Sequence, residues 1–126
     1  MPVRSLNSSV MKWPDKKGVE KSLKKCIRDL LEGRSDILKV GYFGSYARDD
    51  WGVGSDLDLI IILKQTSKSF ERRGIDFDTG DIAVPVDLLV YSRKEWSDME
   101  EKESVFYCTL NEEIEWVFNS EGNLQI

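Results

Sequence analysis

The sequence predicts a single α/β (α+β) domain over residues 15–119, and three observations lead to this fold class. Apolar runs of strand length occupy residues 37–43, 56–63 and 86–91, with polar segments between them. Apolar residues of the segment 19–31 recur every three or four positions, which is the spacing of an amphipathic helix. A chain of 126 residues has the size of one domain. We therefore expect strands and helices around one core.

The N-terminal part is predicted to be an arm followed by a helix. Residues 1–14 are polar and irregular, so we expect a loosely attached arm. Asp15 is a plausible N-cap for the helix that covers 19–31, and Gly33 supplies its C-terminal stop. At the other end of the chain, residues 120–126 form a polar tail.

The next segment predicts two strands with a tight turn between them. The first strand is Ile37–Phe43, and Gly44-Ser45 then forms a turn that opens a short helix ending at about Asp50. The second strand, residues 56–63, contains the solid apolar run LIIIL. Such a run is typical of a central strand that is covered on both faces.

The middle of the chain connects the second strand to a third. The charged residues 64–73 are expected to form a short crossover helix, and residues 74–84 a loop or short hairpin. Pro85 opens a strand over residues 86–91, VDLLVY, which is nearly as apolar as its neighbour.

The last third predicts helices and an edge strand. Ser92 and Glu95 have the spacing of a capping box, which places a helix start at Ser92. That helix is expected to break at 100–103 and to resume through Leu110. Ile114, Trp116 and Phe118 then alternate with Glu113, Glu115 and Val117, which indicates a short, half-buried edge strand.

Composition excludes several classes of function. The net charge of −5 argues against non-specific binding to nucleic acid or to an anionic membrane, because both need clustered positive charge. No apolar run is long enough to cross a bilayer, and the two cysteines form no framework pattern, so we expect a cytoplasmic protein. The sequence contains no histidine, so acid–base chemistry must come from other groups.

Two aspartates at the start of the second strand are the first candidates for a site. Asp56 and Asp58 leave the same face of a strand, about 6 to 7 Å apart along the backbone. Their mutual repulsion raises a pKa or calls for a cation, and oxygen-seeking divalent ions meet that need directly. Asp87, near the start of the third strand, joins this pair if the two strands are neighbours.

The turn before the short helix is a candidate site for an anion. Backbone N–H groups of Gly44 and Ser45 would be free to hold a phosphate, with the Ser45 hydroxyl beside them. Arg48 opposes the helix dipole in the first turn, and a bound anion would reverse that penalty. The sequence contains neither a P-loop nor a dinucleotide fingerprint.

Together these residues point to nucleotide chemistry. Three carboxylates on two neighbouring strands can bracket two Mg²⁺ ions about 3.5 to 4 Å apart. Such ions neutralise the triphosphate of ATP or another NTP and stabilise the leaving pyrophosphate. In-line displacement at phosphorus then needs little else from the protein.

These motifs are similar to those of a known family. The pattern GSYAR at 44–48, followed by SDLDL at 55–59, resembles the minimal nucleotidyltransferases of the DNA polymerase β superfamily, with Asp87 matching the third acidic residue. The resemblance covers roughly residues 19–92. It implies a small mixed β-sheet backed by helices, with the site at its open edge. The frequent glycine after the arginine is Asp49 here, which adds negative charge near the phosphates.

The resemblance also implies a role for each site residue. Asp56 and Asp58 would be shared metal ligands, and Asp87 the ligand nearest the attacking hydroxyl, which it would help to deprotonate. Gly44 and Ser45 would hold the nucleotide phosphates.

Small prokaryotic members of this family are commonly antitoxins that inactivate a helical HEPN-type toxin by transferring AMP to a tyrosine. A single domain leaves the acceptor to a partner protein, another subunit or a small molecule. Our leading hypothesis is therefore Mg²⁺-dependent transfer of NMP, in the first instance AMP, to a partner protein. The alternatives are a small-molecule acceptor, as in antibiotic-modifying relatives, and a non-catalytic binding module. The terminal arm with Trp13 and the edge strand near Trp116 are either contact surfaces or ordinary packing.

Overall fold

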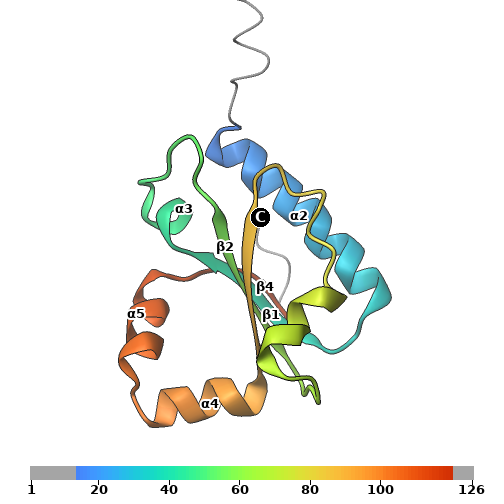
Figure 1. Cartoon of the computed structure of the whole chain (residues 1–126), viewed down its shortest axis with the longest axis vertical. Helices are drawn as coiled ribbons and strands as arrows, with labels where there is room; N and C mark the ends of the chain where they lie inside the picture. Colours follow the sequence, from blue (N-terminus) through green and yellow to red (C-terminus); the bar gives the residue numbers. More distant parts are fainter. Residues whose placement is uncertain (1–13, 121–126) are drawn as a thin grey trace, which may run out of the picture.

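The computed structural model describes residues 14–120 and shows a mixed sheet with helices, as predicted (Figure 1). The predicted arm, including Trp13, and the predicted tail lie outside these residues except for Pro14 and Ser120. The elements in chain order are α2 (Lys16–Gly33), β1 (Ile37–Phe43), α3 (Ser45–Arg48), β2 (Leu57–Leu63), the 3-10 helix η1 (Phe70–Asp76), β3 (Val86–Ser92), α4 (Arg93–Glu101), α5 (Val105–Glu113) and β4 (Glu115–Asn119).

The sheet of the described chain has four strands in the order β3-β2-β1-β4. Strand β1 is antiparallel to β2 and to β4, whereas β2 and β3 are parallel. The predicted bounds of β1 are confirmed, and β2 starts one residue after Asp56. Strand β2 lies inside the sheet and β4 at its edge, which confirms both predicted positions.

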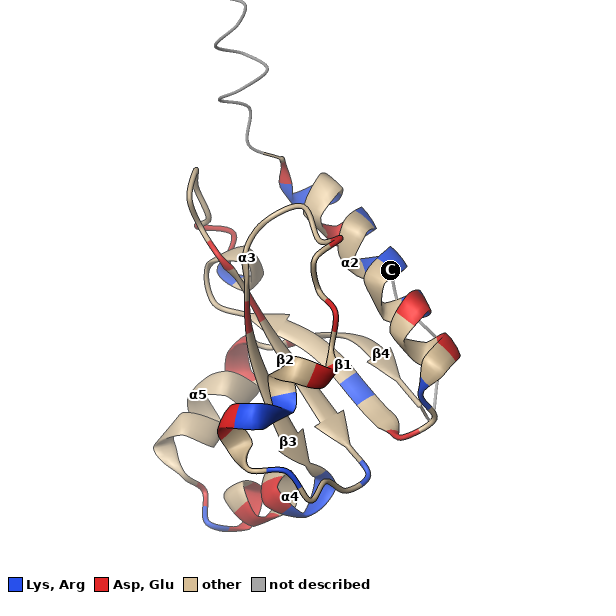
Figure 2. Cartoon of the chain, turned by 45° about the vertical axis from the view of Figure 1, so that its right-hand side comes forward, with Lys and Arg blue, Asp and Glu red and all other residues tan. Residues whose placement is uncertain are grey.

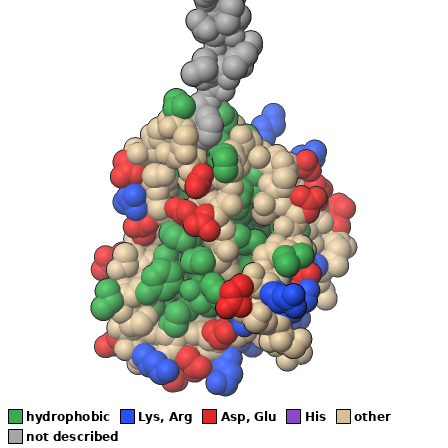
Figure 3. All heavy atoms as spheres, viewed as in Figure 1, with side chains coloured by type: hydrophobic (Ala, Val, Ile, Leu, Met, Phe, Trp, Pro, Cys, Tyr) green, Lys and Arg blue, Asp and Glu red, His purple; other side chains and the backbone are tan. Residues whose placement is uncertain are grey.

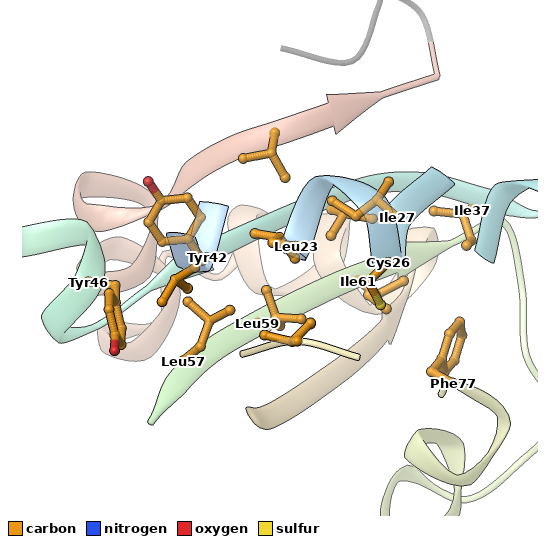
Figure 4. Packing of buried hydrophobic residues seen from close by; sticks show 14 of the residues in the cluster. Leu23, Cys26, Ile27, Ile37, Tyr42, Tyr46, Leu57, Leu59, Ile61 and Phe77 are labelled. Carbon is orange, nitrogen blue, oxygen red and sulfur yellow. The ribbon is translucent and has the colours of Figure 1, made fainter. Parts of the chain in front are cut away.

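The first face of the sheet is covered by α2. Leu23 and Ile27 of this helix point onto Leu59 and Ile61 of β2 (Figure 4), and all four side chains are at most 2% exposed. Helix α2 starts as predicted, because the Asp15 carboxylate accepts a hydrogen bond from the Gly18 N–H at 2.8 Å. This face supplies most of the buried core.

The second face is covered less completely, by α4 and α5. Ile60 and Ile62 of β2 are buried there against Leu110 of α5. Trp96 of α4 and Trp116 of β4 pack edge to face at the border of this cluster, so Trp116 takes part in ordinary packing. Because side chains alternate along a strand, Asp58 belongs to this second face, and the acidic end of β2 therefore opens where the sheet is less covered.

The start of α4 and the predicted break after it are confirmed. Ser92 and Glu95 form a capping box, in which the Glu95 N–H donates to the Ser92 hydroxyl at 3.1 Å and the Ser92 N–H donates to the Glu95 carboxylate at 2.8 Å. The helix ends at Glu101, and Ser104 caps α5, which extends past the predicted end at Leu110 to Glu113.

Two predicted helices differ from the observed ones. Residues 64–69 contain no helix, and the crossover helix is instead η1, whose buried Arg73 donates hydrogen bonds to the carbonyl oxygens of Lys68 and Val90 at 3.0 Å each and to Glu95. The contacts of Arg73 with Val90 and Glu95 therefore determine where η1 lies, and local helix propensity contributes less. Helix α3 ends at Arg48, before the predicted end at about residue 50, because Asp49 adopts a left-handed conformation.

Within residues 14–120, no helix is both long and apolar enough to span a membrane. Cys26 is buried and Cys108 is exposed, both as free thiols. Acidic segments lie in the loop beside α3 and at the adjoining end of the sheet, whereas many Lys and Arg residues lie on α2 and around α4 (Figure 2). The acidic end of the sheet is where the candidate site residues fall.

Candidate active site

A cavity of about 520 Å³ lies between the turn after β1, the start of β2 and helix α5. It brings together five of the six predicted site residues: Gly44, Ser45, Arg48, Asp56 and Asp58. The remaining lining residues are Phe43, Phe106, Thr109, Leu110 and Glu113. The predicted anion-binding turn and the predicted carboxylate pair therefore share one hollow.

The third predicted carboxylate lies beside the pair, on the neighbouring strand. Asp87 of β3 is the register partner of Asp58, and in a parallel ladder such partners lie on the same face of the sheet. Asp56 and Asp87 are exposed, whereas Asp58 is half-buried. Burial, followed by the negative charges of Asp87 and Asp56, raises the pKa of Asp58 above its ordinary value. The sequence-based prediction of mutual repulsion is thus matched at this residue.

Gly44 occupies a conformation that only glycine adopts readily, with φ +78° and ψ −151°. A Cβ atom built on Gly44 would lie 2.0 Å from Oδ2 of Asp58, far inside contact distance. The backbone of the turn therefore approaches the carboxylate because residue 44 has no side chain. This close approach places the predicted phosphate-binding turn directly against a predicted metal ligand.

Glu113, at the end of α5, is a site residue that the sequence interpretation missed. Its Oε1 accepts hydrogen bonds from the Gly44 N–H at 2.5 Å and from the Arg48 guanidinium at 3.0 Å. The Gly44 N–H, which was predicted to donate to a phosphate, therefore donates to the Glu113 carboxylate in this structure. The contact joins residues 69 positions apart, so no local pattern indicates it.

Arg48 lies at the rim of the cavity, with its side chain 50% exposed. Its Nε donates to Asp50 at 3.1 Å, and its other contact is the one to Glu113. The two carboxylates raise the pKa of the guanidinium, so Arg48 stays cationic beside the turn. Its predicted contact with phosphate remains a prediction.

Asp49, which replaces the family's frequent glycine, keeps a glycine-like backbone. Its φ is 62°, the left-handed region that Asp tolerates better than most residues. Its carboxylate accepts a hydrogen bond from the Lys16 ammonium at 2.7 Å, so part of its charge is balanced by α2.

Divalent metal ions fit the chemistry of the donor set, because Asp56, Asp58 and Asp87 supply carboxylate oxygens and Asp58 is disfavoured as an uncompensated anion. Within the described residues, no group of three or more Asp, Glu or Cys side chains is close enough together to hold an ion directly. The metal assignment therefore stays a prediction that rests on the donor set.

An apolar surface adjoins the cavity. Phe106 of α5 lines the cavity and is 46% exposed, and neighbouring Val105 is 83% exposed. Hydrophobic side chains gather into a broad area over α5 and β3, and acidic side chains lie along its upper border (Figure 3). We refer to the side chains of Phe70, Tyr91, Trp96, Val105 and Phe106 as the apolar surface.

Comparisons with known proteins agree with this geometry. The sequence profile described as a nucleotidyltransferase domain matches residues 20–111. A crystal structure of a candidate nucleotidyltransferase from Sulfolobus solfataricus superposes with a TM-score of 0.64 at 18% sequence identity, covering 86% of this chain and 87% of that chain. At this identity the likeness shows a common fold. A search among curated proteins found no match.

Proposed function

The chain belongs to the nucleotidyltransferase domain family, and from this premise we propose that it transfers a nucleoside monophosphate, AMP from ATP in the first instance, to a hydroxyl group of a partner protein. The observation that carries the proposal is the shared cavity. Gly44 and Ser45 of the turn line it together with Asp56 and Asp58, and Asp87 is the register partner of Asp58. An anion-binding turn next to several carboxylates suits a nucleotide triphosphate that is bound together with cations.

We propose Mg²⁺ as the metal, with Asp56, Asp58 and Asp87 as its ligands. When bound, Mg²⁺ ions would neutralise phosphate oxygens and the leaving pyrophosphate. The raised pKa of Asp58 supports this assignment, because a nearby cation relieves the burial and repulsion that disfavour its charged form. In the loaded site, all three side chains would hold metal while the turn holds the phosphates.

The chain's own residues supply the remaining chemistry. Backbone N–H groups at Gly44 and Ser45 would bind and orient the triphosphate, and Arg48 would add its positive charge at the rim. Asp87, exposed at the start of the edge strand β3, would accept the proton of the acceptor hydroxyl. The acceptor oxygen then bonds to the α-phosphorus, and the bond to pyrophosphate breaks.

We propose a protein acceptor because the apolar surface lies next to the cavity. Phe106 belongs to both, so a partner that covers the apolar surface would also reach the rim of the cavity. Phe70, Val105 and Phe106 of this surface are exposed, and exposed apolar side chains that gather in this way are typical of protein contact sites. On the family resemblance, the partner would be a small helical toxin of the HEPN type, with a tyrosine as the acceptor.

The reaction can be tested with the proteins encoded beside this chain's gene. The purified protein is incubated with Mg²⁺, ATP labelled at the α-phosphate and each neighbouring gene product. We expect label to enter one of these proteins, and intact mass to show the addition of AMP. Peptide mapping would then locate the modified hydroxyl.

An Asp58→Asn variant provides the matched control, because it keeps the shape of the side chain and removes its charge. We expect label transfer to disappear while the circular dichroism spectrum stays that of the wild type. Equal transfer by the variant would contradict the assignment of Asp58. Label on a small molecule in place of a protein would support the antibiotic-modifying type of acceptor.

A further inference from the structure

The Glu113 carboxylate occupies the position in the cavity where the proposed function needs an anion. It is held by the Gly44 N–H at 2.5 Å and by the Arg48 guanidinium at 3.0 Å, and its side chain is 19% exposed. Both donors were assigned to the nucleotide phosphates on independent grounds. The Glu113 carboxylate and a nucleotide phosphate would therefore use the same two donors, the Gly44 N–H and the Arg48 guanidinium.

A backbone N–H cannot make a short, charge-assisted hydrogen bond to two anions at once. The Arg48 guanidinium already holds Asp50 as well as Glu113, so the single Gly44 N–H is the donor for which the two anions compete. Glu113 must therefore release Gly44 before a phosphate oxygen can take its place. The release of Gly44 by Glu113 involves a side chain of α5 and needs no movement of the sheet.

The surroundings leave room for that release. A second hollow, of about 500 Å³, lies on the other side of Glu113 and is lined by Ala47, Glu112 and Glu115 among others. Because Glu113 lines both hollows, we expect its carboxylate to turn into the second one when it leaves Gly44. Helix α5 also offers little resistance to small shifts, because Leu110 alone is buried among the residues described in α5.

We propose that Glu113 is a built-in competitor of the nucleotide, which occupies the phosphate-binding turn in the free protein and lowers its affinity for triphosphates. The inference rests on the proposed function, because it takes Gly44 and Arg48 as phosphate donors. The apparent affinity of a site falls with the fraction of molecules in which the site is free. A partner that shifts α5 would raise this fraction, since Phe106 of the apolar surface and Glu113 lie on the same helix.

Substitution of Glu113 tests the competition directly. Glu113→Gln keeps the size of the side chain and removes the charge that competes with phosphate. The matched control is Glu101→Gln, which removes the same charge from an exposed residue at the end of α4 that lines neither hollow. ATP with Mg²⁺, and separately inorganic triphosphate, are titrated into each protein by calorimetry.

We expect Glu113→Gln to bind ATP and triphosphate about tenfold more tightly than the wild type, the equivalent of one net charge-assisted hydrogen bond. Glu101→Gln should differ from the wild type by less than about twofold. Circular dichroism and thermal unfolding establish that each variant is folded. If Glu113→Gln is unfolded, Glu113→Asp, whose shorter side chain reaches Gly44 poorly, should show a gain in the same direction.

Two results would overturn the inference. Equal or weaker ATP binding by folded Glu113→Gln, with wild-type binding intact, would mean that Glu113 does not compete, and the proposed nucleotide site would stand. Absence of binding to any of the proteins would overturn both the competition and the nucleotide site. Binding by Glu113→Gln when the wild type binds too weakly to measure would support the competition.

Discussion

The substitution Gly44→Ala should lower the free energy of unfolding and also prevent nucleotide binding at the turn. The backbone at this residue has φ +78° and ψ −151°, a region that costs a non-glycine residue about 1–3 kcal/mol. The new Cβ would also lie 2.0 Å from Oδ2 of Asp58, so that side chain or the turn must shift. Overpacking of this kind adds about 1–3 kcal/mol. For Gly44→Ala we therefore expect a loss of about 2–6 kcal/mol and no measurable ATP binding.

The assay is urea unfolding followed by circular dichroism, with ATP titration on the folded variant. Gly33→Ala is the matched control, because a Cβ at Gly33 meets no atom within 4 Å and its backbone is not left-handed. We expect this control to raise the free energy of unfolding by about 0.5 kcal/mol, since alanine restricts the unfolded chain. Wild-type stability and ATP binding in Gly44→Ala would refute the assigned geometry of the turn.

Three further predictions follow from named contacts. Without metal, Asp58→Asn should unfold at a higher temperature, by the equivalent of about 0.5 kcal/mol, because it removes a charge that burial and two carboxylates disfavour; a lower melting temperature would contradict this. Glu95→Gln should cost about 2 kcal/mol at pH 7, because it leaves the buried Arg73 guanidinium without its carboxylate partner. Arg73 lowers the pKa of Glu95 from its ordinary 4.5, so this stabilisation is present above pH 4.5 and is lost as the pH falls through the lowered pKa. Urea unfolding should therefore show the stability difference between the two proteins shrinking as the pH falls below 4.5, and a constant difference would argue against the ion pair. Asp49→Gly should change the free energy of unfolding by less than about 0.5 kcal/mol, because glycine suits the left-handed backbone and the Asp49 side chain of the lost ion pair with Lys16 is exposed. A loss above about 1 kcal/mol in urea unfolding would contradict the assignment of this ion pair as a weak surface contact.

The positions of the strands along the sequence, and the placement of β2 inside the sheet, could be predicted because both depend on local sequence patterns. A strand with one exposed face alternates apolar and polar residues, whereas β2 contains a continuous apolar run. This strand does lie inside the sheet. The capping residues of α2, α4 and α5 form local hydrogen bonds. Asp15 was predicted from its residue type before the helix, and Ser92 from the capping-box spacing to Glu95. Asp56 and Asp58 were paired by the strand period of two, and they do line the same cavity, although β2 begins only at Leu57.

Features that depend on long-range contacts could not be predicted in the same way. The neighbouring positions of Asp58 and Asp87 require the parallel register of β2 and β3, which no local pattern specifies. The crossover became a 3-10 helix because Arg73 bonds to Val90 and Glu95, 17 and 22 residues away. Glu113 reached the site only through the return of α5 toward the turn after β1.

Calorimetric titration of ATP, with and without Mg²⁺, into the wild type and Asp58→Asn tests the central claim most directly. We expect binding to the wild type that depends on Mg²⁺ and is lost in the variant, because Asp58 would hold the metal beside the phosphate-binding turn. Binding that is equal in both proteins, or independent of Mg²⁺, would contradict the metal-assisted site. Because Asp58→Asn replaces one carboxylate oxygen by an amide nitrogen and removes the charge while keeping the size of the side chain, the comparison tests the metal-binding role of this carboxylate.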